Sequence, residues 1–316
     1  MSAFERLLAS IQLEGPTGQH YISESYLKRF TEVRRLVVYD RQGNTFSRPQ
    51  RPKFTAVIPH LYTFLDNEDR QRFEFEKMFG IVESRAGSAL KAVVNNSPLI
   101  HEDREYLALF MAMTAIRTPA AFAEARIVRE KAEIARLKLI FSSEADAYRL
   151  IKNFEPAGTP EAEIRRLAKA AFEMVDQEGF KVTVPEELAR QSSLKNWATV
   201  AKALYQRDWT VVHSPSAEDE YITSDSPVVF SPLEGTEDLP LGYESLHTHI
   251  LFPLSRHAAL VMNGDEGRIR HTTVKPEQVA RFNSSVAADC FRYVIGSQEN
   301  VILRTVAAPR RLAIRN

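Results

Sequence analysis

The sequence predicts an α+β protein whose helices and strands occupy separate stretches of chain. Residues 66–207 carry apolar side chains at helical spacing, whereas residues 208–316 contain short β-branched and aromatic runs bounded by Pro, Gly, Asn and Asp. Because the two patterns follow one another instead of alternating, they favour α+β over a doubly wound sheet. We predict a helical central region packed on a mostly antiparallel C-terminal sheet, with a small N-terminal hairpin in residues 1–65.

Composition indicates a globular protein with an ordinary core. Of 316 residues, 44% are apolar and 26% are charged, which is enough to bury a sizeable interior. No stretch rich in Gly, Ser or Pro separates the three regions, and there is no internal repeat. We therefore predict a single compact domain over residues 1–316.

Charge and cysteine content exclude some classes of protein. The 41 basic and 41 acidic residues cancel, so no overall field draws the chain to nucleic acid or to an anionic membrane. The single Cys290 cannot form an internal disulfide and fits a reducing compartment. No apolar run approaches 18 residues, and residues 1–8 lack the features of a signal peptide. We expect a cytoplasmic protein that makes no membrane contact; its oligomeric state has no signature in the sequence.

The N-terminal region reads as a helix followed by a hairpin. Residues 23–30 predict a short helix with Ser23 as its cap. Residues 36–39 and 45–47 predict two strands joined by the polar turn 40–44.

The central region predicts a series of helices. Apolar residues recur at three and four between residues 68 and 94, and the helix at 101–117 stops at Thr118-Pro119. Further helices are predicted at 120–141, 143–153, 159–178 and 185–207.

The C-terminal region predicts strands around one helix. The strands expected are 209–213, 221–224, 228–230, 249–252, 259–262 and 292–295, with a helix at 276–290.

Two charged residues fall on apolar helix faces. Glu83 shares its face with Phe79 and Ala86, and Arg117 shares its face with Phe110 and Met113. Since an unpaired buried charge costs several kcal/mol, we expect Glu83 and Arg117 to meet. The pair could fix helix register or form the charged floor of a pocket, and the sequence leaves both interpretations open.

Asp225 and His20 are two further candidates. Asp225 ends a strand before a turn, which suits a catalytic carboxylate, a metal ligand or a cap that accepts backbone N–H groups. His20 precedes a helix and could be a general base, a neutral metal ligand or a structural residue. His247 and His249 share a strand face, but no further metal ligand lies at a usual spacing. Phosphate-binding glycine loops, dinucleotide fingerprints, nucleophile elbows and paired-cysteine zinc sites are absent.

The stretch His20-Tyr21-Ile22-Ser23-Glu24-Ser25-Tyr26-Leu27-Lys28-Arg29-Phe30 is similar to the signature of a mainly bacterial family, domain of unknown function 4238. Later landmarks of the resemblance are Val82-Glu83-Ser84, Arg117-Thr118-Pro119, Thr223-Ser224-Asp225-Ser226-Pro227 and Phe252-Pro253-Leu254-Ser255. The resemblance implies that His20, Glu83, Arg117 and Asp225 belong to one site, lined by Tyr21 and Tyr26. It implies no particular reaction.

An imidazole, a guanidinium and two carboxylates together favour a hydrolase, such as a metal-dependent phosphodiesterase or nuclease. His20 would be a base or ligand, Glu83 and Asp225 would hold a divalent metal, and Arg117 would neutralise developing negative charge. The substrate could be a small molecule or a nucleic acid. The alternative is a non-enzymatic binding or interaction protein, defence- or phage-related, or a ligand sensor, in which these residues are structural.

Overall fold

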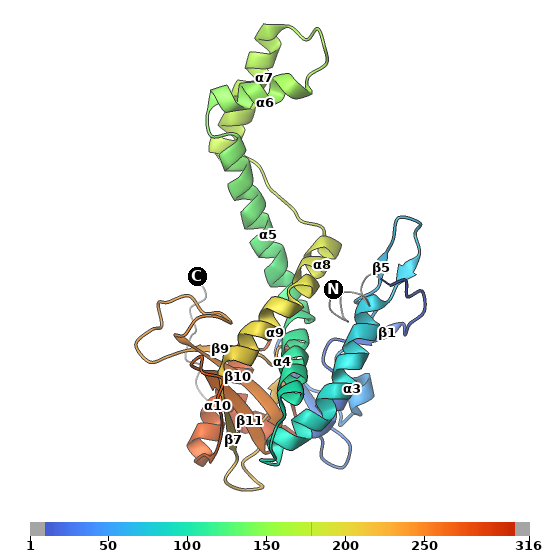
Figure 1. The fold of residues 1–316 in the computed structure, drawn as a ribbon, viewed down its shortest axis with the longest axis vertical. Helices are drawn as coiled ribbons and strands as arrows, with labels where there is room; N and C mark the ends of the chain where they lie inside the picture. Colours follow the sequence, from blue (N-terminus) through green and yellow to red (C-terminus); the bar gives the residue numbers. More distant parts are fainter. Residues whose placement is uncertain (1–9, 178, 307–316) are drawn as a thin grey trace. The chain divides into compact units, whose positions relative to one another are not determined.

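The structure of the chain is a computed structural model that describes residues 10–177 and 179–306 (Figure 1). Its internal contacts divide the chain into two compact units. Unit 1 comprises residues 1–121 and 193–316, and unit 2 comprises residues 122–192. The predicted single domain over residues 1–316 stays a prediction.

The main sheet of unit 1 has five strands in the order β12-β7-β11-β10-β9. Their bounds are β7 Asp208–His213, β9 Val229–Pro232, β10 Thr248–Ser255, β11 Ala258–Asn263 and β12 Ile269–Thr273. Only the pairing of β12 with β7 is parallel; the other three pairs are antiparallel. The prediction of a mostly antiparallel C-terminal sheet in an α+β fold is therefore confirmed.

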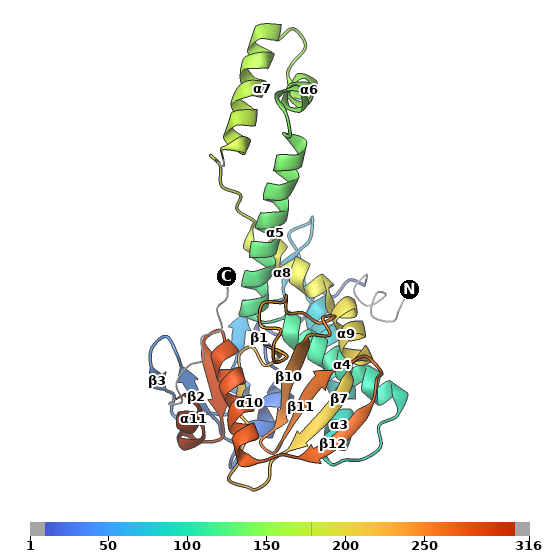
Figure 2. The ribbon, with the colours of Figure 1, turned by 90° about the vertical axis from the view of Figure 1, so that its left-hand side faces the viewer.

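Helices cover both faces of this sheet, which explains why its strands β10 and β11 are mostly apolar and buried (Figure 2). On one face, Trp209 donates from its indole N–H to the carbonyl oxygen of Leu204 at 2.9 Å, and the ring of Phe252 lies 6.4 Å from that of Phe110. On the other face, Leu251 packs in a core cluster with Phe282. Alternate side chains of one strand thus serve two separate cores.

Five helices of unit 1 surround the sheets. They are α3 Glu74–Val94, α4 His101–Ile116, α9 Trp197–Gln206, α10 Pro276–Asp289 and α11 Glu299–Val306. Helix α3 begins six residues later than predicted, because Gln71–Arg72 pairs with Phe64–Leu65 as the hairpin β5-β6. The predicted helix over 185–207 is two helices, because the chain breaks at Asn196, which precedes α9.

A second sheet contains the predicted N-terminal hairpin. Its order is β3-β2-β13-β8, with β2 Val37–Asp40, β3 Thr45–Phe46, β8 Thr223–Ser224 and β13 Tyr293–Gly296. Every pair is antiparallel, and Tyr39 is opposite Phe46. The Asp40 carboxylate accepts the backbone N–H groups of Gln42 and Gly43, which stabilises the turn. The hairpin prediction is confirmed.

The N-terminal signature forms a strand and a short helix. Strand β1 Gly18–His20 pairs with β4 Val57–Pro59, and α2 Glu24–Leu27 continues into the 3-10 turn Lys28–Phe30; a second 3-10 turn spans Pro52–Phe54. Ser23 occupies the N-cap position but makes no side-chain cap. The capping prediction was wrong because the Ser23 hydroxyl donates to Glu83 instead.

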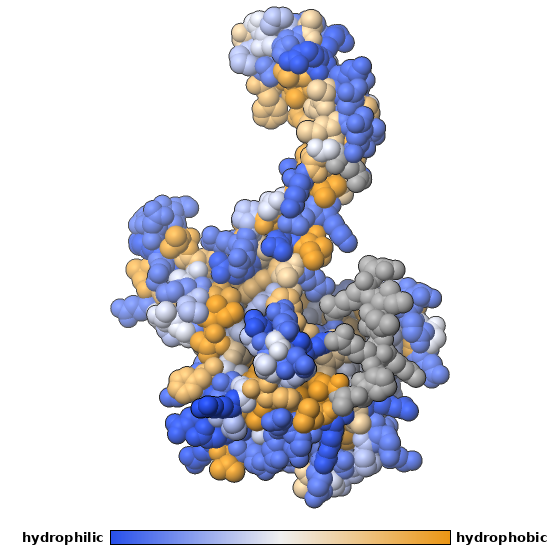
Figure 3. Space-filling model, turned by 180° about the vertical axis from the view of Figure 1, so that it is seen from behind, coloured by the Kyte–Doolittle hydropathy of each residue, from blue (hydrophilic) through white to orange (hydrophobic). Residues whose placement is uncertain are grey.

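Unit 2 contains helices α6 Glu144–Phe154 and α7 Glu161–Asp176. Helices α5 Pro119–Ile140 and α8 Glu186–Lys195 each cross a boundary between the units. Figure 3 shows apolar side chains of unit 2 interspersed with charged ones on its surface, and Leu139 and Phe154 are mostly exposed. Among the described residues, no single helix is long and apolar enough to cross a bilayer; the consecutive pair α4 and α5 meets the length and composition only when joined across a bend.

Tyr26 joins the signature helix to both sheets. It is fully buried, its ring stacks on that of Phe252 at 5.3 Å, and its hydroxyl donates to the carbonyl oxygen of Pro253 at 2.9 Å. The same hydroxyl lies 2.8 Å from Thr223 Oγ1. Its position at this junction predicts a large contribution to the stability of unit 1.

We expect Tyr26→Phe to lower the free energy of unfolding by about 1–3 kcal/mol, because it leaves buried partners without a hydrogen bond. Tyr39→Phe is the matched control, since the hydroxyl of Tyr39 bonds Asn44 at an exposed site, and should change it by less than about 0.5 kcal/mol. Urea titration followed by tryptophan fluorescence reports unit 1, where both tryptophans, Trp197 and Trp209, lie. Equal effects of the two substitutions would contradict this role.

Candidate functional site

Glu83 and Arg117 form the ion pair that the sequence predicts. Glu83 lies midway along α3, and Arg117 follows the last residue of α4. Arg117 Nη2 donates to Glu83 Oε1 at 2.7 Å, with the arginine side chain 2% exposed and the glutamate side chain 25% exposed. The guanidinium carbon lies 4.8 Å from the centre of the Phe79 ring. The charge of Arg117 is therefore balanced by one carboxylate and one aromatic face.

The same pair fastens the N-terminal signature to the helices. The second carboxylate oxygen of Glu83 accepts from Ser23 Oγ at 2.7 Å. The Tyr62 hydroxyl lies 3.1 Å from the carbonyl oxygen of Arg117 and 3.2 Å from that of His20. Segments 20–23 and 62 are thus tied to the middle of α3 and the end of α4 by polar contacts.

His20 lies within electrostatic reach of this pair. Burial lowers the pKa of its imidazole, Glu24 and Glu83 oppose that shift, and Arg117 adds to it. Its Nε2 is buried and has no hydrogen-bond partner among the described residues. The imidazole is accordingly neutral at pH 7.

Glu76 belongs to the same cluster, although the sequence analysis did not select it. Burial raises the pKa of its carboxyl to about 6; Arg117 lowers that pKa and Glu83 raises it. Glu76 precedes Glu83 by seven residues, so the two carboxylates share one face of α3. The helix-face argument that identified Glu83 could have identified Glu76 as well.

Asp225 acts as a backbone cap. Its carboxylate accepts the N–H groups of Phe291 at 2.9 Å, Arg292 at 2.8 Å and Tyr293 at 2.9 Å. Burial raises the pKa of this carboxyl to about 6, while the three backbone donors lower it. Among the described residues, no hydrogen bond joins Asp225 to Glu83 or Arg117.

Both tyrosines expected to line a site are buried. Burial raises the pKa of Tyr21, which also senses the charge of Asp225. Tyr21 also contributes to the raised pKa of Tyr62, so Tyr21 is within electrostatic reach of both Asp225 and Tyr62. The hydroxyl of Tyr26 is engaged by Pro253 and Thr223. The catalytic roles of His20, Glu83, Arg117 and Asp225, and substrate contacts by these tyrosines, stay predictions.

The residues present do not fit a divalent metal. Within residues 10–177 and 179–306, no three His, Cys, Asp or Glu side chains are grouped so that they could hold one. A hard cation needs six or more oxygen ligands, whereas the carboxylates of Asp225 and Glu83 are already bonded to protein donors.

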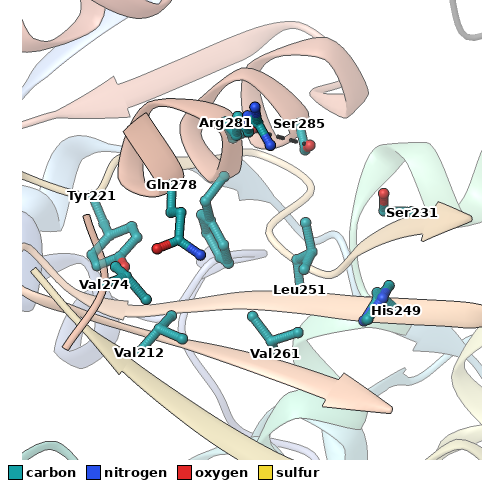
Figure 4. A pocket seen from close by; sticks show the side chains of 11 residues that line it. Val212, Tyr221, Ser231, His249, Leu251, Val261, Val274, Gln278, Arg281 and Ser285 are labelled. Carbon is teal, nitrogen blue, oxygen red and sulfur yellow. Dashed lines mark hydrogen bonds between the residues drawn. The ribbon is translucent and has the colours of Figure 1, made fainter. Parts of the chain in front are cut away.

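A cavity of about 280 Å³ lies between α10 and the five-stranded sheet (Figure 4). Its apolar lining comes from strands, the segment after β12 and the helix: Val212, Leu251, Val261, Val274 and Phe282. Its size is close to the lower end of the range for small-molecule sites. Val212, Leu251 and Phe282 are buried in the core cluster, and Val261 and Val274 are partly buried against it.

Polar groups line the same cavity. Tyr221 is 1% exposed, yet its hydroxyl has no hydrogen-bond partner among the described residues, and the same holds for the buried Nδ1 of His249. Figure 4 shows Tyr221 and His249 toward opposite ends of the cavity, with Leu251 and Val261 between them and Arg281 on α10. Burial raises the pKa of Tyr221 and lowers that of His249, so both are neutral at pH 7.

Contacts with α10 fix the wall that carries Tyr221. Asn283 accepts the backbone N–H of Ile222 at 3.1 Å and donates to the carbonyl oxygen of Glu220 at 2.8 Å. The ring of Tyr221 meets that of Phe282 edge to face at 5.1 Å. These residues could not be identified from the sequence, because each lies in an ordinary strand or helix pattern and only the packing of α10 on the sheet brings them together.

We expect Glu83→Gln to lower the free energy of unfolding by about 1–3 kcal/mol, because Arg117 would stay buried without a counter-charge. Glu68→Gln removes a carboxylate from an exposed pair with Arg70, 2.9 Å away, and should cost less than about 1 kcal/mol. Urea titration measures both. A cost for Glu83→Gln no larger than that of its control would mean that the ion pair does not brace the fold.

Comparison with known proteins places the chain in a family. No curated protein and no solved structure matches it. A family model described as a protein of unknown function, DUF4238, matches residues 18–300 and so covers most of the chain. The chain belongs to the DUF4238 family.

Proposed function

We propose that the protein is a non-enzymatic binding protein that holds one small ligand in the cavity beneath α10. The observation that carries the proposal is the Tyr221 hydroxyl, which is buried in that cavity without a partner. A buried hydroxyl that makes no hydrogen bond costs about 1–3 kcal/mol. A bound ligand would remove this cost, and His249 Nδ1 offers a second unused polar atom in the same space.

The cavity has the rigidity that a binding site requires. Asn283 fixes the chain on both sides of Tyr221, and Phe282 fixes its ring. A site arranged before the ligand arrives loses less conformational entropy on binding. In this proposal the ligand is a small molecule and the protein is cytoplasmic, as the single Cys290 predicts.

In this proposal His20, Glu83 and Arg117 are structural. Their hydrogen bonds run to Ser23, to Tyr62 and to each other, so they attach the signature segment to α3 and α4. Asp225 likewise attaches β8 to the start of β13. The guanidinium of Arg117 and the carboxylates of Glu83 and Asp225 each have protein hydrogen-bond partners.

One observation favours the hydrolase as a second candidate. Burial raises the pKa of Glu76 to about 6, while Glu83 is paired with Arg117. Of two carboxyl groups in different environments, one can act as general acid and the other as general base. His20 lies within electrostatic reach of Glu83 and is a third group for proton transfer. This candidate rests on protein side chains as acid and base, because no three His, Cys, Asp or Glu side chains of the described residues are grouped to hold a metal.

We expect indole to stabilise the protein by binding in the α10 cavity, because a ligand that binds only the folded state raises its melting temperature. Val261→Phe should abolish the shift, since the larger ring fills the cavity from its floor; Val274→Phe fills it from another side. Ile127→Phe, at an exposed position of unit 2, is the matched control. An indole shift of equal size in wild type and in both filled variants would contradict the proposed site.

We expect His20→Ala to lower the free energy of unfolding by about 1–2 kcal/mol, because it removes a packed imidazole at the ion pair. Indole binding should be unchanged, since His20 does not line the cavity. His247→Ala, at an exposed site, is the control and should be within about 0.5 kcal/mol of wild type. Unchanged stability in His20→Ala would remove the structural role and favour the hydrolase.

A further inference from the structure

The residues that line the α10 cavity also indicate the charge of its ligand. Within residues 10–177 and 179–306, Arg281 is the only lining residue with a permanent charge, and no carboxylate lines the cavity. Among the described residues, the Arg281 guanidinium makes no hydrogen bond or ion pair; its backbone carbonyl oxygen accepts from Ser285 Oγ at 3.2 Å. An arginine over a cavity whose described lining residues include no carboxylate creates a positive potential there.

The other polar groups that line the cavity are suited to a ligand that accepts hydrogen bonds. The neutral Tyr221 hydroxyl is a donor, and neutral His249 presents an Nδ1 that can donate or accept. Hydroxyl groups of Ser231 and Ser285 border the same space. An oxygen-rich head group could accept from several of them.

The apolar lining requires a ligand with a body as well as a head group. The lining contains valine, leucine and phenylalanine side chains on the sheet, on α10 and in the segment before α10. These side chains exclude a purely ionic ligand, because such a ligand would bury no apolar surface against them. The volume of about 280 Å³ limits that body to about one ring or a short chain.

We propose that the ligand of the α10 cavity is a small organic monocarboxylate, with an aromatic or aliphatic body on the valine-lined floor and its carboxylate at Arg281. This inference rests on the proposed binding function. The guanidinium offers paired N–H donors that match the two oxygens of a carboxylate. Tyr221 would bond any hydroxyl or carbonyl oxygen at the inner part of the ligand.

The test uses the full chain and three probes at low ionic strength. Benzoate has both the ring and the charge, benzamide has the same shape without the charge, and inorganic phosphate has charge without a ring. Methyl NMR shifts of Val212, Val261 and Leu251 report occupancy. We expect benzoate to bind with a dissociation constant of about 0.1–10 mM, as its few atoms allow, and at least about tenfold more tightly than benzamide or phosphate.

Arg281→Gln should weaken benzoate about tenfold and leave benzamide unchanged, because it removes the charge from an exposed side chain. Arg304→Gln, on the exposed side of α11, is the matched control and should change neither. Tyr221→Phe separately tests the inner contact: it should leave the fold of the unliganded protein intact and weaken 4-hydroxybenzoate more than benzoate.

Each contrary result has a distinct meaning. Benzamide binding as tightly as benzoate, or no effect of Arg281→Gln on benzoate, would overturn the monocarboxylate and leave the proposed binding function standing. Phosphate binding as tightly as benzoate would also overturn it, since the site would then recognise charge alone. If neither benzoate nor benzamide nor indole shifts the cavity methyl signals, the proposed function itself fails.

Discussion

A guanidinium with almost no access to water is the constraint around which the N-terminal half of unit 1 is arranged. Arg117 follows α4, so its charge must be met by something that reaches the end of that helix, and Glu83 on α3 does so. The Glu83 carboxylate also accepts a hydrogen bond from Ser23, and the Tyr62 hydroxyl donates one to the carbonyl oxygen of Arg117. One ion pair thereby joins α3, α4 and the signature segment. In our proposal this pair is structural, because removing either partner would leave a buried charge uncompensated.

The five-stranded sheet separates the Glu83–Arg117 ion pair from the α10 cavity. Alternate residues of β7, β10 and β11 face α4 and α9 on one side and α10 on the other. The two faces of the sheet therefore pack against different helices. The α4 side is filled by large rings such as Trp209 and Phe252, and Tyr26 adds its hydroxyl bonds there. The α10 side is incompletely filled, and its unfilled part contains unused polar atoms. A protein that only needed stability would gain by filling that space, which is why we regard the cavity as functional.

Patterns confined to one helix or one strand could be read from the sequence. The helix face of Glu83 and its partner Arg117, the turn at Asp40, the hairpin β2-β3 and the α+β class all follow from local spacing. The start of α3 could not be predicted from the sequence, because residues 71–72 pair with residues 64–65 in a hairpin and the helix begins only after that strand. Ser23 looked like a cap, but tertiary contact with Glu83 outweighed the local bond. Tyr221 and Arg281 are unremarkable in sequence, and His249 stood out only as a possible metal ligand beside His247, since their relation depends on where α10 lies on the sheet.

The central claim is that a small ligand binds on the α10 side of the sheet and that the buried ion pair is structural. Intermolecular nuclear Overhauser effects between bound indole and isotopically labelled side chains locate the ligand directly. Our account predicts contacts from the indole ring protons to the methyl groups of Val212, Leu251 and Val261. Contacts to the rings of Tyr62 and Phe79 beside Arg117, with none to Val261, would contradict it.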